Sequence, residues 1–239
     1  MFDPLRSNLP LIVYLDVKSP YAFIARKPTY RMAQVLGIDV DWRPLTLDIP
    51  SYLGSARLDK SGRVAESKRT PQQWSAVKYA YRDARRYAGL QGYVLRGTEK
   101  IWDTSLIHIA MLWVAGQGQL LLKRFLDDVL ERFWRREFDA EDLELITDAM
   151  DRAGADVDGF AGYASGEGRR IHDDMQQKIF AAGIFGVPTY VVEEEVYFGR
   201  EHLPRVRWIL EGRKGQAPDI AYELEAVAPG AATSSLRGD

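Results

Sequence analysis

The chain has no cysteine in its 239 residues. Its own side chains therefore form no disulfide, no thiolate nucleophile and no thiolate metal site. Exchange between a dithiol and a disulfide needs an attacking protein sulfur, so a disulfide oxidoreductase is excluded. The lack of cysteine also fits a reducing compartment, and we expect a cytoplasmic protein.

Other chemical signals are scarce or absent. The three histidines, His108, His172 and His202, have no metal-ligand spacing, so no metal site is expected. We expect His108 in the core and His172 on a helix surface. No glycine-rich phosphate loop supports a nucleotide cofactor. We expect no signal peptide and no membrane-spanning helix, because every apolar run is short. The net charge of −2 argues against nucleic acid as a partner.

The apolar patterns at the two ends of the chain predict strands around one helix. Residues 11–15 form an apolar run, residues 19–36 read as a helix, and residues 38–42 alternate as a second strand. This order is a βαβ unit. Near the other end, residues 188–192 and 196–198 read as two strands, and residues 202–211 as a helix. The pattern predicts a ββα unit that completes the same sheet.

The middle of the chain predicts helices. Residues 50–71 are irregular and polar, which indicates a long loop. Helical patterns then cover residues 72–87, 103–115, 120–135, 140–153 and 168–182. The predicted fold class is α/β, a thioredoxin-like sheet (βαβ…ββα) with a large all-helical insertion. The expected division is a thioredoxin-like domain over 1–70 and 184–224, a helical insertion domain over 71–183, and a disordered tail over 225–239.

Two distant motifs indicate a thiol-binding site. Ser19-Pro20-Tyr21-Ala22 follows the first strand, and Gly186-Val187-Pro188-Thr189 precedes a later one. A thioredoxin-like redox protein carries two cysteines at the first place and a cis-proline at the second. Taken alone, Ser19 reads more simply as a helix N-cap. With a cis Pro188 opposite, its hydroxyl and the helix N-terminus would stabilise a thiolate brought by a ligand.

These motifs support a family resemblance. The chain resembles the 2-hydroxychromene-2-carboxylate isomerase family, close to kappa-class glutathione transferases and more distantly to DsbA. The matching segments are residues 16–22, 42–45, 78–88, 103–104, 182–190, 198–199 and 203. The resemblance implies glutathione as the cofactor, an isomerase activity on an aromatic carboxylate, and a homodimer.

The resemblance also implies a cofactor site. Ser19 is the catalytic residue that holds the glutathione thiolate, with Tyr21 beside it. Val187 and Pro188 present backbone groups to the cysteinyl part of glutathione. The γ-glutamyl end is expected at Arg200, Glu201 and His202, where the chain departs from the family's acidic–arginine pair.

A basic segment offers candidates for the substrate site. Residues 57–100 carry eleven lysines and arginines against four acidic residues. Lys78, Arg82 and Arg86 are expected to bind a substrate carboxylate, because Arg82 and Arg86 share a helix face. A solvated helix face accounts for this segment equally well. Asp103, an asparagine in the family, is assigned to the same site.

Three functions remain open from the sequence. The first is a glutathione-dependent isomerase that works by reversible thiol addition, with Ser19 assisting ionisation of the thiol. A kappa-class-like glutathione transferase, which would release the adduct, is the second. The third is a non-catalytic, DsbA-like protein that binds a thiol or a peptide. Glutathione affinity separates the third from the first two.

Overall fold

A four-stranded mixed sheet lies at the centre of this computed structural model, which describes residues 2–219. The strands are β1 (Leu11–Leu15), β2 (Val40–Pro44), β5 (Thr189–Val192) and β6 (Glu195–Phe198), in the spatial order β2-β1-β5-β6. β1 runs parallel to β2 and antiparallel to β5. Every residue of β1 is buried, as its unbroken apolar run requires for a strand covered on both faces.

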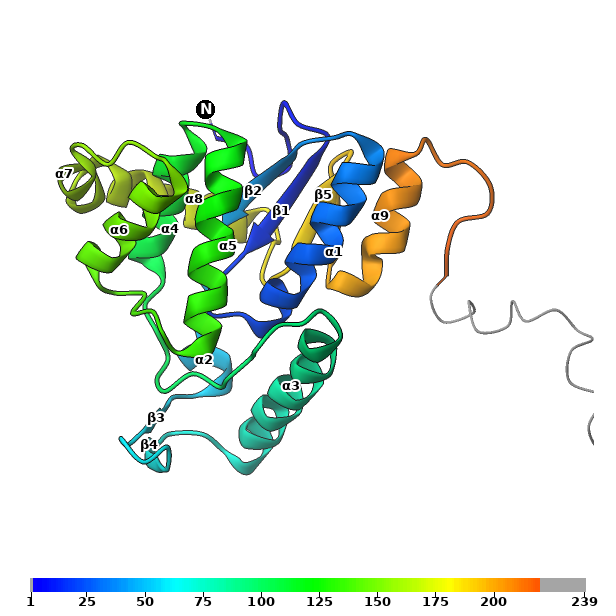
Figure 1. The fold of residues 1–239 in the computed structure, drawn as a ribbon. Helices are drawn as coiled ribbons and strands as arrows, with labels where there is room; N and C mark the ends of the chain where they lie inside the picture. The colour runs from blue at the N-terminus through cyan, green and yellow to red at the C-terminus, as the bar shows by residue number, and fades with distance from the viewer. Residues whose placement is uncertain (1, 220–239) are drawn as a thin grey trace, which may run out of the picture.

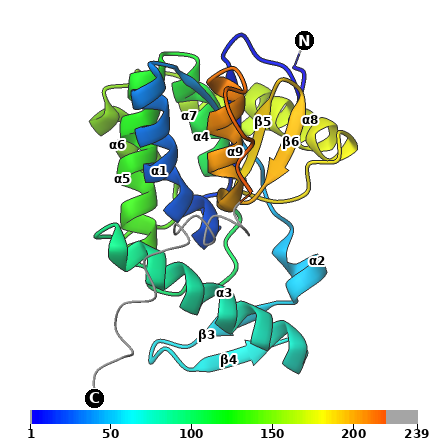
Figure 2. The ribbon, with the colours of Figure 1, turned by 90° about the vertical axis from the view of Figure 1, so that its right-hand side faces the viewer.

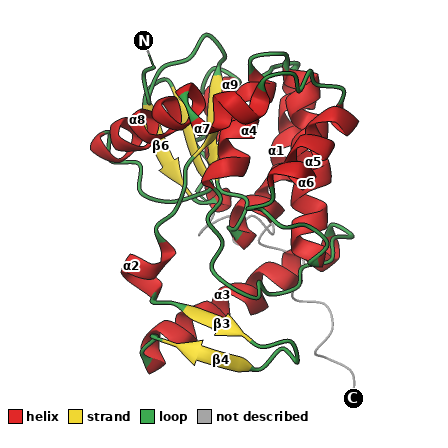
Figure 3. Cartoon of the chain, turned by 90° about the vertical axis from the view of Figure 1, so that its left-hand side faces the viewer, coloured by secondary structure: helices red, strands yellow, loops and turns green. Residues whose placement is uncertain are grey.

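Helices cover both faces of the sheet. α1 (Pro20–Leu36) and α9 (Leu203–Leu210) lie on one face, and α8 (Glu167–Ala181) lies on the other (Figures 2 and 3). α1 begins after Ser19 and ends at Gly37, whose φ of 63° is the left-handed conformation that glycine tolerates at a helix end. The predicted βαβ and ββα units are confirmed, with a short 3-10 turn (Arg200–His202) before α9.

The insertion is helical, as expected. It contains α3 (Pro71–Leu90), α4 (Ser105–Ala115), α5 (Gln119–Arg135), α6 (Leu143–Ala153), α7 (Phe160–Ser165) and α8. α4 contacts β2, and the buried apolar residues of the sheet and the helices form one continuous cluster. The division into two domains therefore remains a prediction. The tail predicted over 225–239 lies outside the described residues.

The predicted loop over residues 50–71 is wrong. This segment contains α2 (Ile49–Leu53) and an antiparallel hairpin of β3 (Ala56–Leu58) and β4 (Val64–Ser67). β4 is exposed along its length, so the hairpin has little apolar alternation for a sequence pattern to reveal. Its turn is held by Asp59, whose carboxylate accepts hydrogen bonds from the backbone of Ser61 and Arg63.

α3 lies at one end of the sheet and contacts α1, near the end of α1 that follows β1 (Figures 1 and 2). The hairpin lies on the side of α3 that faces away from α1 (Figure 2). In open α/β sheets ligands bind beyond the carboxyl ends of strands.

Over residues 2–219, no helix combines the length and the apolar character needed to cross a membrane.

Candidate active site

Ser19 and the Val187–Pro188 segment lie together, although 168 positions separate them. The Val187–Pro188 peptide bond is cis, as predicted. The Ser19 hydroxyl oxygen accepts a hydrogen bond from the backbone N–H of Ala22 at 3.2 Å, so Ser19 does cap α1. The same hydroxyl donates to the carbonyl oxygen of Val187 over a long 3.5 Å. Its proton is only weakly held there and can turn towards a ligand.

A buried charge cluster lies directly behind Ser19. The carboxylate of Asp16 is fully buried at the end of β1. It accepts from the Thr104 hydroxyl at 2.8 Å and from the Leu47 N–H at 2.8 Å, and it lies 3.4 Å from the Lys18 ammonium. Burial works against ionisation of Asp16, but His108 and Lys18 outweigh it and hold the pKa of the carboxyl well below its usual range.

A chain of polar contacts continues from this cluster to the surface. His108 Nε2 lies 3.4 Å from Asp16 Oδ1, and His108 Nδ1 lies 2.6 Å from the hydroxyl of Thr46. That hydroxyl is also 2.8 Å from His172 Nε2, and His172 Nδ1 is 2.8 Å from Asp173. His108 lies in the core as expected. The surface position expected for His172 is wrong, because its ring is buried against Thr46.

The single proton of the Thr46 hydroxyl sets the direction of this chain. Burial lowers the pKa of His172, against the opposing effect of Asp173, so the ring is neutral near pH 7. Its Nδ1–H donates to Asp173, which leaves Nε2 to accept from Thr46. The Thr46 oxygen must then accept from His108 Nδ1–H. On its other side, His108 Nε2 accepts from the backbone N–H of Val17 at 3.4 Å and lies 3.4 Å from Asp16 Oδ1.

The two residues that flank Ser19 in the sequence line an apolar cavity of about 90 Å³. We call it the inner cavity. Lys18 and Pro20 line one side, and the apolar wall comes from α2, α3 and the segment before α4. The lining residues are Lys18, Pro20, Ile49, Leu53, Arg69, Val77, Ala80, Tyr81, Thr98, Lys100, Ile101 and Trp102. The cavity thus has an apolar wall large enough to contact a ring, with cations at its edges.

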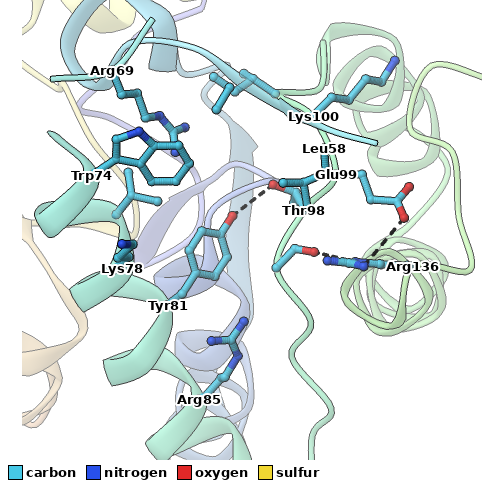
Figure 4. A pocket seen from close by; sticks show the side chains of 14 residues that line it. Leu58, Arg69, Trp74, Lys78, Tyr81, Arg85, Thr98, Glu99, Lys100 and Arg136 are labelled. Atoms are coloured by element: carbon cyan, nitrogen blue, oxygen red, sulfur yellow. Dashed lines mark hydrogen bonds and ion pairs between the residues drawn. The ribbon is translucent and has the colours of Figure 1, made fainter. Parts of the chain in front are cut away.

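A second cavity of about 300 Å³ continues from the first, and we call it the outer cavity. The two share six lining residues, among them Arg69, Tyr81 and Lys100. Figure 4 shows its two walls, with α3 on one side and residues 97–101 on the other, joined by a 3.1 Å hydrogen bond between Tyr81 and Thr98. Its charged lining residues are Arg69, Lys78, Arg85, Glu99, Lys100 and Arg136. With one acid among five cations, the outer cavity favours an anion.

The structure separates the expected substrate residues. Lys78 lines the outer cavity, together with Arg85 about two turns further along α3. Arg82 and Arg86 are exposed and line neither cavity. Arg86 pairs with Asp83 at 3.5 Å, and Arg82 lies over the ring of Tyr79.

Asp103 also lies outside both cavities. Its carboxylate accepts from the backbone N–H of Ser105 at 2.9 Å, at the start of α4. Burial opposes ionisation, but the hydrogen bonds from Ser105 dominate and lower the pKa of Asp103. Asp103 therefore supports the helix start. Its neighbour Thr104 reaches the charge cluster.

The residues expected around the γ-glutamyl end lie next to α1. The Arg200 guanidinium lies 3.6 Å from the ring centroid of Tyr87 on α3. Glu201 is exposed, and the His202 ring lies 5.7 Å from that of Tyr197. Tyr21 donates to Asp83 at 3.3 Å, so its hydroxyl points to α3.

Tyr21 and Arg200 belong to one group of side chains between α1 and α3. Burial and the carboxylate of Asp83 raise the pKa of Tyr21 to about 12, while Arg200 works in the opposite direction. The Tyr21 hydroxyl therefore stays neutral at any physiological pH. It serves as a donor that joins the two helices.

Residues 10–211 match the DSBA-like thioredoxin domain. The chain belongs to this family. It is 22% identical over 192 residues to the 2-hydroxychromene-2-carboxylate isomerase of Sphingobium xenophagum, with 80% of this chain and 92% of that protein covered. The resemblance to such an isomerase and the thioredoxin-like fold are thereby confirmed.

Solved structures agree on the fold. One of a 2-hydroxychromene-2-carboxylate isomerase has a TM-score of 0.61 at 19% identity and covers 85% of this chain and 93% of that one. The cytosolic disulfide reductase DsbM of Pseudomonas aeruginosa with GSH has a TM-score of 0.53 at 17% identity, and covers 85% of this chain and 98% of that one. This DSBA-like chain has no cysteine, and so it lacks the sulfur that a dithiol–disulfide oxidoreductase needs.

Several residues at the site escape sequence reasoning. Lys18 directly precedes the first motif, and its position between a strand and Ser19 was a usable signal. Asp16 was visible as the first polar residue after an apolar strand. Arg69 lines both cavities from the link between β4 and α3, and Lys100 lines both from the irregular segment between α3 and α4. Neither segment has a periodic pattern that would mark these residues.

Proposed function

We propose that this chain is a glutathione-dependent isomerase of the 2-hydroxychromene-2-carboxylate isomerase type, acting on an aromatic carboxylate. The observation that carries the proposal is the position of Ser19. Its hydroxyl stands at the start of α1, opposite Val187, in a chain without cysteine. A thiol nucleophile must then come from a small molecule.

The donor set fits a bound thiol with a peptide backbone. The Ser19 hydroxyl can donate to the sulfur, and the N-terminus of α1 favours the thiolate form. Within residues 2–219 the Val187 N–H donates to no protein acceptor, so it is free to pair with a peptide-like ligand. Arg200 and Glu201 lie next to α1 and offer opposite charges to the γ-glutamyl end. When bound, the thiol supplies the nucleophile that adds to an unsaturated carbon and later leaves.

The two cavities support an aromatic carboxylate as the substrate. The inner cavity adjoins Pro20, directly after Ser19, and its apolar wall suits a ring. The outer cavity carries the excess of cations, and Lys78 and Arg85 face it with no acidic partner in the described part of the chain. We propose that the ring occupies the inner cavity and the carboxylate points outwards. The relative named 2-hydroxychromene-2-carboxylate isomerase supports the choice of reaction. The similar structure of a reductase with GSH supports the choice of cofactor.

One observation favours a second candidate, a DsbA-like peptide-binding protein. The rings of Phe185 and Phe198 pack against each other in a tilted arrangement, with centroids 5.0 Å apart, and are 66% and 45% exposed. They lie beside the Val187–Pro188 segment, where an extended peptide would run. An exposed aromatic pair in such a place fits a partner surface. The homodimer implied by the resemblance stays a prediction, which analytical ultracentrifugation tests.

The test is turnover of 2-hydroxychromene-2-carboxylate with and without glutathione, followed by ultraviolet absorbance and mass spectrometry. The proposal predicts an isomer of unchanged mass, formed only when glutathione is present. A stable glutathione adduct would identify a transferase. No reaction, together with no binding of glutathione, would contradict both enzyme functions and leave the peptide-binding protein.

A further inference from the structure

Lys18 is a buried cation at the wall of the inner cavity. Its side chain is 6% exposed. An ammonium is rarely buried, because it loses its hydration, unless it is paired with an opposite charge and hydrogen-bonded. It directly precedes Ser19, so it lies within one residue of the proposed thiol site. Its backbone N–H donates to Asp16 Oδ1 at 3.1 Å, which fixes the start of the side chain.

A count of donors leaves one N–H bond of Lys18 free. An ammonium carries three N–H bonds. One points to the Thr104 hydroxyl at 3.2 Å, and one to Asp16 Oδ2 at 3.4 Å. No third acceptor for the Lys18 ammonium is found among residues 2–219, and Lys18 lines the inner cavity.

The support of Lys18 is rigid. Asp16 is fully buried and is itself held by Thr104, Leu47 and His108. The other cations around the cavities are more exposed or are already paired. Lys100, for example, lies 2.6 Å from Glu141. A charge fixed in advance and shielded from water stabilises developing charge better than a mobile surface lysine does.

We propose that Lys18 is a further catalytic residue, whose free N–H binds the substrate oxygen that gains negative charge during the reaction. The inference rests on the proposed function. It assigns one task to the cations of the outer cavity and another to Lys18. The outer cations bind the carboxylate in ground state and transition state alike. Lys18 binds an oxygen atom conjugated with the attacked carbon, and no proton changes hands. The electron pair that moves onto this oxygen returns when the sulfur leaves.

The first test needs neither glutathione nor the substrate. 4-Nitrophenol is titrated into the wild type, Lys18→Met and Lys178→Met at a pH near its own pKa, and the absorbance of the bound phenolate is measured. The wild type should prefer the phenolate over the neutral phenol by about tenfold or more, the equivalent of one pKa unit. Lys18→Met should lose this preference. Lys178→Met, an exposed lysine of α8 that lines neither cavity, should keep it.

The second test separates catalysis from binding. With 2-hydroxychromene-2-carboxylate and glutathione, Lys18→Met should lower kcat by about 10²- to 10³-fold, as loss of one donor to an oxyanion does, with little change in KM. The thiolate absorbance of bound glutathione should remain, because Ser19 is intact. Lys18→Arg should recover part of kcat. Should Lys18→Met fail to fold by circular dichroism, Lys18→Gln takes its place in both tests.

Three results would overturn the inference, and a fourth would overturn only the proposed function. A wild type that binds phenol and phenolate equally removes the oxyanion site, whatever reaction the protein catalyses. A rise in KM at constant kcat makes Lys18 a binding cation. Loss of the thiolate absorbance makes Lys18 part of the cofactor site. If the wild type prefers the phenolate but does not isomerise the chromene, the proposed function fails while the oxyanion site stands.

Discussion

Replacing Asp16 by asparagine removes the charge at the centre of the buried cluster while keeping the size of the side chain. Asp16 Oδ1 accepts from Thr104 and from the Lys18 N–H, and lies 3.4 Å from His108 Nε2. Asp16 Oδ2 accepts from Leu47 and faces the Lys18 ammonium at 3.4 Å. At the Oδ2 position the NH₂ group would face the Leu47 N–H and the Lys18 ammonium, and at Oδ1 it would face the Lys18 N–H. In either orientation Lys18 loses its counter-charge.

The expected cost follows from burial. Asp16 is fully buried, and the Lys18 side chain is 6% exposed, so water replaces the lost charge poorly. Removing one partner of a buried ion pair destabilises a protein by about 3–5 kcal/mol. We therefore expect Asp16→Asn to lower the free energy of unfolding by about that amount at pH 7.

Urea denaturation of wild type and variant measures this loss. The pKa of Asp16 is depressed in the fold, so its contribution is present above the unfolded pKa of about 3.9 and is lost as the pH falls towards the folded pKa. The difference between the two proteins should accordingly shrink below about pH 4. Asp148→Asn breaks an exposed pair with Arg152 and should cost less than about 1 kcal/mol. A loss at Asp16 as small as at Asp148 would refute the reasoning.

Three further predictions concern other parts of the site. Burial lowers the pKa of His172, so the unfolded chain binds a proton more readily than the folded chain does. The melting temperature of the wild type should therefore fall as the pH drops below about 6.5. The melting temperature of His172→Gln should fall less over the same pH range. Lys78→Met, which changes the outer cavity, should raise KM about three- to tenfold in a turnover assay, and more than Arg82→Met, which lies outside both cavities. Gly186→Ala should lower the melting temperature and weaken glutathione binding in calorimetry, because a Cβ there would lie 2.6 Å from the ring of Phe198.

The sheet and its first helix could be predicted because local patterns determine them. The apolar run of β1, the cap Ser19 and the terminal Gly37 are each readable over a few residues. The meeting of Ser19 with Pro188 was accessible only through the family motif. The pattern of α8 also held a signal that was missed, since His172, Met175 and Ile179 recur at helical spacing and all three are buried.

The remaining parts of the site depend on contacts between distant segments. The bond of Lys18 to Thr104 joins residues 86 apart, and no local pattern announces it. Arg85 lines the outer cavity where its Nε donates to the carbonyl oxygen of Leu95 at 3.0 Å, a contact with a segment outside α3 that helical spacing does not show. The hairpin contributes Ala56 and Leu58 to the same cavity, and its strand β4 is exposed along its length, so the sequence pattern does not reveal its position.

The central claim is that Ser19 and α1 hold the thiolate of glutathione. We would first titrate glutathione into the wild type and Ser19→Ala by calorimetry, and follow thiolate formation by ultraviolet difference absorbance. A free cysteine thiol has a pKa of about 8.5, so thiolate absorbance at pH 7 would report stabilisation by the protein. The account predicts micromolar to millimolar binding with thiolate in the wild type, and binding without thiolate in Ser19→Ala. No binding to the wild type at ten millimolar glutathione, or equal thiolate in both proteins, would contradict it.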